Sequence, residues 1–304
     1  MIPPAWIAAD WGTSRLRLWA LDGTGRVIAT RQSEDGMGRL KPEDFEPAFL
    51  RAAGDLLPDG TVTPVLICGM AGARTGWHEA GYAQVPAAPL AAPDPVRTRD
   101  PRLTVRILPG LSQSDPPDVM RGEETQIAGL LAGTPEFDGL VCLPGTHTKW
   151  VRVAGGIVNG FRTAMTGELF EALSTRSTLA AFAAEGWDDA AFAAAADAAL
   201  ETAAPLTADL FALRARGLLT GYGPGEGRAR LSGLLIGAEV AGMRSLWPGM
   251  PVTLLGDARL CALYAQALGL AGLEARVTES EALTLAGLRA AWDANPPMIG
   301  KDGR

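Results

Sequence analysis

The sequence predicts an α/β protein in which two similar domains face each other across a ligand-binding cleft. The first observation is a repeated order of elements: three strands, a helix, a strand, a helix, a strand and a helix. This order begins at Trp6 and begins again at Leu140. The second is that each copy opens with an apolar strand followed by a turn of small residues. The third is a length of 304 residues, enough for two domains with separate cores. A duplicated unit of this order places both turns where α/β sheets bind ligands.

The first copy begins with residues 5–22. An apolar run ends in Asp10, a turn with Gly12 follows, and apolar and polar residues then alternate up to Trp19. This pattern predicts a strand, a tight turn and a second strand. The elements expected next are a strand over residues 25–33, a helix over 42–57, a strand over 62–68, a proline-rich irregular segment over 86–101, a strand over 103–108, a loop over 109–117 and a helix over 119–131.

The second copy carries additional helices. Its expected elements are strands over residues 139–143, 150–153 and 157–163, helices over 168–174, 189–202, 208–216 and 228–246, a strand over 252–255, a helix over 258–268 and a strand over 274–277. Thr278 and Glu281 have the spacing of a capping box and predict the start of a last helix, to about residue 291. We therefore expect domains over residues 1–135 and 136–304, with the last helix as an element that can pack back on the first domain.

Composition and charge argue against several classes of protein. The net charge of -7, from 27 basic and 34 acidic residues, argues against a nucleic-acid-binding or membrane-surface protein. No apolar run is long enough to span a bilayer and the N-terminus has no basic signal-peptide region, so a cytoplasmic protein is expected. The three cysteines lie in apolar contexts typical of buried, reduced thiols, and with two histidines a zinc site is not expected.

The first turn has the residue types of a phosphate and magnesium site. Asp10 ends an apolar strand, and Gly12, Thr13, Ser14 and Arg15 supply backbone N–H groups, two hydroxyls and a cation. A carboxylate beside such a turn can hold a hydrated Mg²⁺ next to a nucleotide phosphate. An ordinary hairpin, with Asp10 as a turn residue, explains this segment equally well when it is considered alone.

The second turn favours the phosphate interpretation of the first. Gly145, Thr146, His147 and Lys149 follow the opening strand of the second copy, and Lys149 is one of only three lysines. Alone, His147 and Lys149 are better explained as a solvated strand edge. Paired with the first turn, they predict a clamp that holds a polyphosphate from two sides.

Two further segments carry candidate chemistry. Glu123 and Glu124 open a predicted helix and point about 100° apart, so both cannot serve one site. A kinase needs one carboxylate to accept a hydroxyl proton, and we assign this role to Glu123. For Glu124 we favour the ordinary preference of acidic residues for a helix N-terminus. Gly256 ends a strand where a nucleotide can approach the backbone, while Asp257 is expected to be an N-cap.

Six motifs together resemble the 2-dehydro-3-deoxygalactonokinase family. They are residues 9–13 (ADWGT), 69–72 (GMAG), 120–126 (MRGEETQ), 144–150 (PGTHTKW), 161–169 (FRTAMTGEL) and 231–240 (LSGLLIGAEV). The resemblance runs from the first strand to the last helix. It implies duplicated ribonuclease-H-like domains of the sugar kinase, actin and heat-shock ATPase superfamily. It also implies ATP-dependent phosphorylation of the terminal hydroxyl of 2-dehydro-3-deoxy-D-galactonate, in galactonate breakdown.

The resemblance assigns roles to several residues. Asp10 matches the Mg²⁺-associated aspartate, Gly145 and Thr146 match the second phosphate loop, and Gly256 falls in the adenosine segment. In related kinases such as glycerol kinase a Gly-Asp pair supplies the base, whereas this chain has Glu123 after a glycine. The extra methylene moves the carboxylate by roughly one bond, and transfer geometry tolerates little error. Asp10 therefore stays a rival for the base.

The implied substrate is a carboxylate, so its site should contain a cation, for which arginine offers a bidentate match. Arg162 and Arg121 lie in the long motifs and are ranked above Arg74, which lies on the glycine-rich loop after residue 68. A surface position explains any of them equally simply. Two other functions stay open, a kinase for another sugar or sugar acid and a non-enzymatic ATP-dependent switch. The sequence leaves open whether the chain forms a homodimer.

Overall fold

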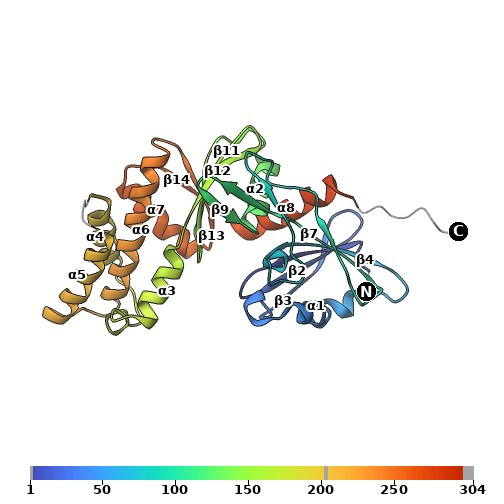
Figure 1. Cartoon of the computed structure of the whole chain (residues 1–304), viewed down its shortest axis with the longest axis horizontal. Helices are drawn as coiled ribbons and strands as arrows, with labels where there is room; N and C mark the ends of the chain where they lie inside the picture. The colour runs from blue at the N-terminus through green and yellow to red at the C-terminus, as the bar shows by residue number, and fades with distance from the viewer. Residues whose placement is uncertain (1–2, 202–204, 297–304) are drawn as a thin grey trace. The chain divides into compact units, whose positions relative to one another are not determined.

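The computed structural model describes residues 3–201 and 205–296 (Figure 1). Its internal contacts divide the chain into two compact units. The first unit comprises residues 1–137, 154–160 and 280–304, and the second comprises residues 138–153 and 161–279. The contacts thus assign residues 280–296, which follow the last strand, to the first unit. The domain boundary expected at residue 135 stays a prediction.

The first unit contains a six-stranded sheet in the order β3-β2-β1-β4-β7-β6. The strands are β1 (Trp6–Trp11), β2 (Leu16–Leu21), β3 (Val27–Ser33), β4 (Thr63–Gly69), β6 (Asp94–Val96) and β7 (Leu103–Ile107). β1, β2 and β3 form an antiparallel meander, whereas β4 and β7 continue the sheet parallel to β1. The strand, turn and strand predicted around Asp10 are confirmed, with Asp10 paired to Arg17 in register.

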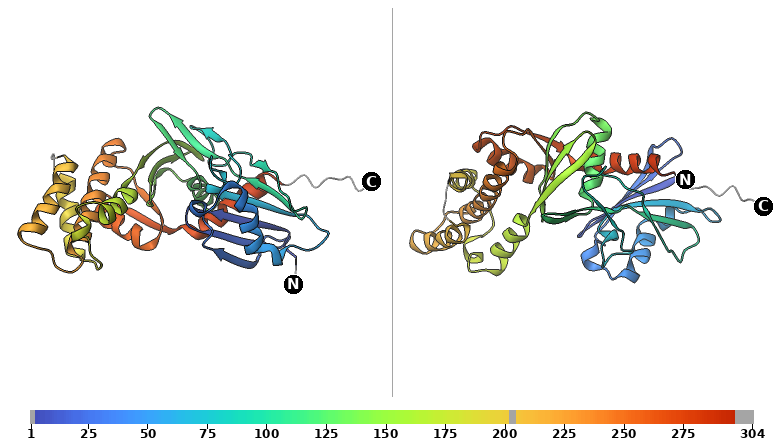
Figure 2. Two further views of the ribbon diagram at one scale, coloured as in Figure 1. Left: turned by 60° about the horizontal axis from the view of Figure 1, so that its bottom comes forward. Right: turned by 45° about the horizontal axis from the view of Figure 1, so that its top comes forward.

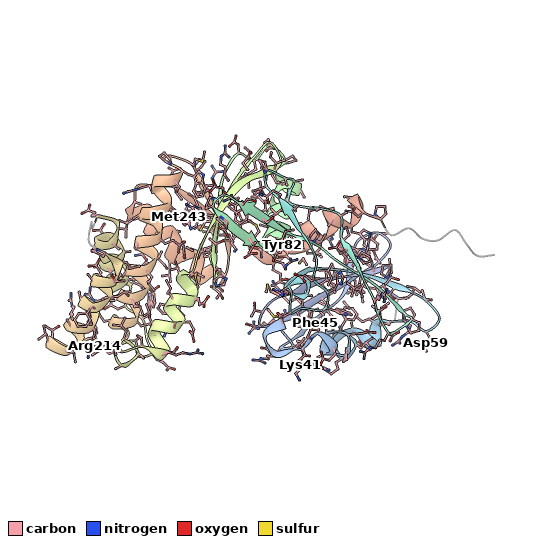
Figure 3. The ribbon with its side chains drawn as sticks, in the orientation of Figure 1. Lys41, Phe45, Asp59, Tyr82, Arg214 and Met243 are labelled. Atoms are coloured by element: carbon pink, nitrogen blue, oxygen red, sulfur yellow. The ribbon has the colours of Figure 1, made fainter. Side chains whose placement is uncertain are left out.

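Helices cover both faces of this sheet. Side chains alternate between the faces along each strand, so neighbouring residues of β1 pack against different helices. On one face, Ile7 and Trp11 pack against Phe45 of α1 (Phe45–Ala53), which is labelled in Figure 3. On the other face, Trp6 stacks on Trp292 of α8 (Ser280–Ala294), with ring centroids 4.4 Å apart. Burial on both sides explains why β1 is an almost continuous apolar run.

A second, three-stranded sheet in this unit corrects two expectations. Its strands are β5 (Tyr82–Gln84), β8 (Gly110–Ser114) and β9 (Pro117–Met120), in the order β5-β8-β9. The loop expected over residues 109–117 is therefore wrong. The helix expected over residues 119–131 is present as α2 (Glu123–Gly133), but it begins four residues later than expected. A four-residue strand is too short to show a periodicity of two, so β9 is defined by its pairing with β8.

The second unit repeats the topology of the first. Its five strands run in the order β12-β11-β10-β13-β14, an antiparallel meander continued by parallel strands, as in β3-β2-β1-β4-β7. The strands are β10 (Gly139–Leu143), β11 (Thr148–Ala154), β12 (Ile157–Ala164), β13 (Val252–Gly256) and β14 (Ala275–Glu279). This repetition confirms the fold class predicted from the sequence, a duplicated α/β unit.

Five helices of the second unit follow the expected order. They are α3 (Thr166–Arg176), α4 (Asp189–Glu201), α5 (Leu206–Leu219), α6 (Glu226–Leu246) and α7 (Ala258–Leu270). Residue 202, the expected end of α4, lies outside the described residues. Figure 2 shows α4 and α6 side by side. Their backbones approach so closely at Gly233 that a Cβ on this residue would lie 2.3 Å from the Phe192 carbonyl oxygen. Glycine, which has no Cβ, permits this approach.

The capping box expected at the start of the last helix is wrong. Thr278 lies within β14, opposite Leu255 in register, and α8 begins only at Ser280. α8 packs on α2, where a Cβ on Gly287 would lie 1.9 Å from the Thr125 carbonyl oxygen. Glycine thus sets the distance between these two helices, and the spacing of Thr278 and Glu281 was coincidental.

Two expectations from composition can be compared with the structure. All three cysteines are free and buried, as expected. Among the described residues, no helix is both long enough and apolar enough to cross a membrane.

Candidate functional site

In the first unit, two glycines bring β1, β4 and α2 together. Gly69 ends β4 with φ +88° and Gly122 precedes α2 with φ +108°, a region that favours glycine. A Cβ on Gly122 would lie 3.3 Å from the Gly69 Cα, and a Cβ on Gly69 would lie 3.5 Å from Asp10 Oδ1. These close approaches place Asp10 near the start of α2, which carries Glu123.

Asp10 is held by an ion pair. Arg17 Nη2 donates to Asp10 Oδ2 at 2.5 Å, and Arg17 Nη1 lies 3.5 Å from Glu281 Oε2. Burial acts to lower the pKa of Arg17, but the Asp10 carboxylate outweighs it, so the pKa lies above its ordinary value. Arg17 therefore stays charged and fixes the orientation of the Asp10 carboxylate. The sequence offered a signal for this pair, since residues opposite each other across the predicted hairpin can interact.

The two glutamates at the start of α2 have different environments. Glu123 is partly buried, and its Oε2 accepts the Arg121 N–H at 3.0 Å. Glu124 is fully buried; its Oε2 accepts the Gly122 N–H at 2.6 Å and its Oε1 lies 3.0 Å from the Thr125 hydroxyl. Burial, reinforced by the charge of Glu123, raises the pKa of Glu124 to about 8. Glu124 is thus largely neutral at pH 7 and supports the helix start from within.

In the first turn two carbonyl groups are occupied, the Gly12 N–H donates to the Arg15 carbonyl oxygen at 2.8 Å, and the next two N–H groups point elsewhere. The carbonyl oxygens of Gly12 and Thr13 accept N–H groups from Met37 and Gly38, at 3.0 and 2.9 Å. Thr13 and Ser14 are exposed, and their N–H groups have no partner within the part of the chain that the structure describes. Backbone N–H groups presented in this way form an anion-binding concavity.

The second turn has the same arrangement. The carbonyl oxygen of Thr146 accepts the Glu168 N–H at 2.9 Å, and a Cβ on Gly167 would lie 2.2 Å from the Gly145 carbonyl oxygen. The first turn of α3 therefore packs directly against this turn. The N–H groups of Gly145, Thr146 and His147 have no partner among the described residues. Each unit thus presents one potential anion-binding turn.

The basic residues of the second turn point in different directions. The His147 Nε2 lies 2.5 Å from Glu168 Oε2, and both side chains are about half exposed. Lys149 is buried, and its Nζ donates to the Thr163 hydroxyl at 2.9 Å. A solvated strand edge therefore describes His147 but not Lys149.

A cavity of about 220 Å³ adjoins the second turn, entirely within the second unit. Gly145 and Gly167 form part of its wall. The Arg228 guanidinium lies 4.8 Å from the centre of the Phe170 ring, and that of Arg259 lies 5.5 Å from the Trp187 ring. Flat aromatic and guanidinium groups with aliphatic side chains beside them suit a planar, uncharged ring system such as a nucleobase.

Gly256 and Asp257 lie next to this cavity. A Cβ on Gly256 would lie 3.3 Å from the Pro144 carbonyl oxygen, so the end of β13 lies against the second turn. The predicted N-cap role of Asp257 is confirmed, since its side chain accepts the Leu260 N–H at 3.0 Å. Asp257 also lines the cavity.

The three candidate substrate arginines differ in burial and contacts. Arg121 is buried, donates to the Ala80 carbonyl at 2.7 Å, and lies 4.3 Å from the ring of Tyr82, which is labelled in Figure 3. Its Nε and Nη1 have no hydrogen-bond partner among the described residues. Arg162 is half-buried on β12, and Arg74 is exposed. Neither guanidinium group forms a hydrogen bond or ion pair within the described chain.

The cavity contains residues that the sequence analysis did not identify. They are Phe170, Trp187, Arg228 and Arg259. Each lies on a different helix or loop, and none belongs to a short motif. Phe170 comes directly after a quoted motif, which is the only local signal. Their common role depends on the packing of α3, α6 and α7.

The repeated sheet topology, together with relatives that are named as kinases, defines the class of this protein: a phosphotransferase built from a duplicated α/β unit. The model of the 2-keto-3-deoxy-galactonokinase family matches residues 10–291. The chain belongs to this family.

Individual relatives agree over nearly the whole chain. A Rhizobium meliloti (strain 1021) protein named as a 2-dehydro-3-deoxygalactonokinase is 42% identical, over 96% of this chain and 97% of the relative. The 2-dehydro-3-deoxygalactonokinase of Escherichia coli (strain K12) is 36% identical, over 93% and 96%. A Sinorhizobium meliloti crystal structure described under the same enzyme name has a TM-score of 0.87 at 41% identity, covering 96% of this chain and 100% of that chain. The prediction of a kinase is confirmed.

Proposed function

We propose that this kinase transfers the γ-phosphoryl group of ATP to the terminal hydroxyl of 2-dehydro-3-deoxy-D-galactonate, in galactonate catabolism. The product is 2-dehydro-3-deoxy-6-phospho-D-galactonate. The observation that carries the proposal is the pair of turns in which the N–H groups of Thr13 and Ser14, and those of Gly145, Thr146 and His147, have no partner among the described residues. Such turns suit the phosphates of a nucleotide, and the names of the family and its relatives support the sugar acid.

In this proposal the nucleotide lies across both turns. The base occupies the cavity next to Trp187 and Arg259, with Gly256 at its edge. The phosphates bind the second turn through Gly145, Thr146 and His147, with Lys149 supporting the turn from inside. They bind the first turn through Gly12, Thr13, Ser14 and Arg15.

The first unit offers one carboxylate for magnesium. The described residues contain no group of three or more His, Cys, Asp or Glu side chains that could hold a metal. A Mg²⁺ ion held through Asp10, water and phosphate oxygens fits this, because Mg²⁺ usually keeps several waters. When bound, the ion neutralises phosphate charge.

Glu123 acts as the base that accepts the proton of the attacking hydroxyl. Asp10, the rival, is ion-paired with Arg17, which occupies one of its carboxylate oxygens. Burial raises the pKa of Glu124 to about 8 and its oxygens are engaged within the helix start, so Glu123 is the better placed glutamate of α2 for this role. Water exclusion on closure of the units limits wasteful ATP hydrolysis.

Arg162 is the preferred partner of the substrate carboxylate. It is half-buried and forms no ion pair within the described residues, so its guanidinium is available for a bidentate contact. Arg121 is engaged with Ala80 and Tyr82, which suits a role in holding the loop over residues 80–82. Arg74, exposed on the glycine-rich loop, is the third candidate.

A substrate panel tests the proposal. ADP release, measured with a coupled assay, is expected to have the highest kcat/KM with 2-dehydro-3-deoxy-D-galactonate. The kcat/KM values for its C4 epimer and for neutral hexoses are expected to be at least about tenfold lower. Loss of one polar interaction worth about 1.4 kcal/mol produces a difference of this size. A higher kcat/KM with another sugar or sugar acid would transfer the assignment to the alternative substrate.

A homodimer and a cytoplasmic location complete the proposal. α5 exposes Phe211, Leu218 and Leu219, an apolar face that a second copy of the chain would cover. The free cysteines suit a reducing compartment. Light scattering at micromolar concentration is expected to give twice the chain mass, and a monomer mass would contradict the homodimer.

A further inference from the structure

A buried carboxylate, Glu239 of α6, lies behind the nucleotide cavity. Its side chain belongs to the motif over residues 231–240, and the residue is only 9% exposed. Glu239 Oε1 accepts the indole N–H of Trp150 at 2.6 Å, and Oε2 accepts the Tyr264 hydroxyl at 2.8 Å. Neither the phosphate turns nor the candidate base requires such a group.

The partners of Glu239 come from the elements that build the site. Thr166, at the start of α3, also forms a side-chain hydrogen bond to Glu239. The Tyr264 hydroxyl lies 2.8 Å from the hydroxyl of Thr148, the first residue after the second turn. Thr166 and Tyr264 both line the cavity. One carboxylate thus connects α6 to β11, α3 and α7.

A contribution to stability does not by itself explain why a carboxylate is buried at this position. Burial raises the pKa of Glu239, and the hydrogen bonds from Thr166, Trp150 and Tyr264 oppose that rise only in part. Apolar residues in place of a buried polar group often give equal or greater stability. A buried network that has all its hydrogen bonds does, however, hold its elements in one fixed arrangement.

We propose that Glu239 is a positioning residue for ATP. It holds the start of α3 and the end of the second turn at a fixed distance from the cavity wall, and so sets nucleotide affinity without touching the nucleotide. The inference rests on the proposed placement of ATP in this cavity. It predicts an effect on ATP that is not shared by the sugar acid.

The experiment compares Glu239→Gln and Tyr264→Phe with the wild-type enzyme. Both are expected to raise KM for ATP, and the dissociation constant of the analogue AMPPNP, by about tenfold, because Glu239→Gln places an amide NH₂ group, which cannot accept, opposite the Tyr264 hydroxyl, and Tyr264→Phe removes that hydroxyl. KM for the sugar acid is expected to change by less than about twofold. The double variant should show less than the sum of the two single effects, since both residues act in one network.

Glu226→Gln is the matched control. Glu226 lies at the start of the same helix and pairs with Arg230, outside the cavity. This variant loses the same charge from α6 and should keep wild-type KM values. If Glu239→Gln and Tyr264→Phe lower the melting temperature but leave KM for ATP and AMPPNP binding unchanged, the role of Glu239 is structural and the inference is wrong.

Trp187→Ala distinguishes this failure from failure of the proposed nucleotide site. If Trp187→Ala raises KM for ATP while the Glu239 variants do not, the cavity binds ATP and only the positioning role is overturned. If neither Trp187→Ala nor the Glu239 variants affect ATP binding, the placement of ATP in this cavity is itself wrong, and the inference falls with it.

Discussion

Two neighbouring glutamates show how strongly a single position depends on its surroundings. Glu123 and Glu124 are adjacent in sequence, but one is partly exposed and the other is fully buried against the start of α2. Burial raises the pKa of Glu124 to about 8, and its carboxyl accepts the Gly122 N–H, whereas Glu123 is the residue proposed as the base. Their different roles lead to two predictions at the scale of single residues.

Glu123→Gln is expected to lower kcat by about 10² to 10⁴-fold, the usual contribution of general base catalysis. The amide keeps the shape of the side chain and cannot accept the hydroxyl proton. Steady-state kinetics with ATP and the sugar acid measure the loss, and the melting temperature controls for folding. Turnover near the wild-type value, with an inactive Asp10→Asn, would assign the base to Asp10.

Glu124→Gln is expected to change how stability depends on pH. In the unfolded chain the Glu124 carboxyl loses its proton near the ordinary pKa of 4.5, whereas the folded protein keeps it up to about pH 8. The unfolded state therefore binds fewer protons between these values, and the free energy of unfolding falls as pH rises through this window. Glu124→Gln has no titratable group at this position, so it lacks this contribution to the pH dependence of the free energy of unfolding.

Urea unfolding at pH 5 and pH 8.5 measures the difference. The stability of Glu124→Gln relative to the wild-type protein should increase from the lower to the higher pH. Glu46→Gln is the control, since Glu46 is a buried glutamate of the same unit that accepts N–H groups from Arg99 and Asp100. A constant difference between Glu124→Gln and wild type would show that Glu124 is ionised in the folded protein.

At the scale of elements, glycine backbones decide where the functional side chains lie. Gly69 and Gly122 adopt positive φ, and their lack of Cβ atoms allows the end of β4 to meet the start of α2. The second unit uses Gly167 and Gly256 in the same way around the second turn. These contacts join segments about 20 to 110 residues apart in the chain.

Gly122→Ala is expected to destabilise the fold by about 1 to 2 kcal/mol and to lower kcat as well, because φ +108° strains any side chain. The strain is located one residue before Glu123 and displaces it. Gly133→Ala is the control: it lies at the end of the same helix, and a Cβ there meets nothing within 4 Å. Equal urea midpoints and kcat values for the two variants would contradict this prediction.

At the scale of the whole molecule, one topology occurs twice, and each copy carries a turn with N–H groups that have no partner among the described residues. Asp10 and Glu123 belong to the first unit, while Glu239 and the cavity proposed to hold the nucleotide base belong to the second. Nucleotide and metal should therefore stabilise the molecule together.

AMPPNP with Mg²⁺, at about 100 times its dissociation constant, is expected to raise the free energy of unfolding by about 2.7 kcal/mol. Thermal unfolding of the whole chain measures the shift. Removal of Mg²⁺ with EDTA, or Asp10→Asn in the presence of Mg²⁺, should reduce it. An AMPPNP shift that is independent of both Mg²⁺ and Asp10 would contradict the assignment of Asp10 to the metal.

The accuracy of the sequence predictions followed the range of the interactions involved. The sequence predicted the strands on either side of the two turns, the helix α6 and the N-cap at Asp257. Periodicity and capping depend on a few neighbouring residues, so a local pattern is enough to predict them. The sheet formed by β5, β8 and β9 was missed, because short strands are defined by their pairing partners. The capping box at Thr278 failed for a related reason, since β14 extends through it along β13.

The sequence by itself determined the duplicated α/β unit, the two glycine-containing turns and the family, because these follow from local patterns and motifs along the chain. Only the tertiary structure decided that Glu124 is buried and neutral, and that Lys149 points inward. It also decided that Phe170, Trp187, Arg228 and Arg259 line one cavity in front of Glu239. The physical reason is that burial and electrostatic environment arise from contacts between residues far apart in sequence.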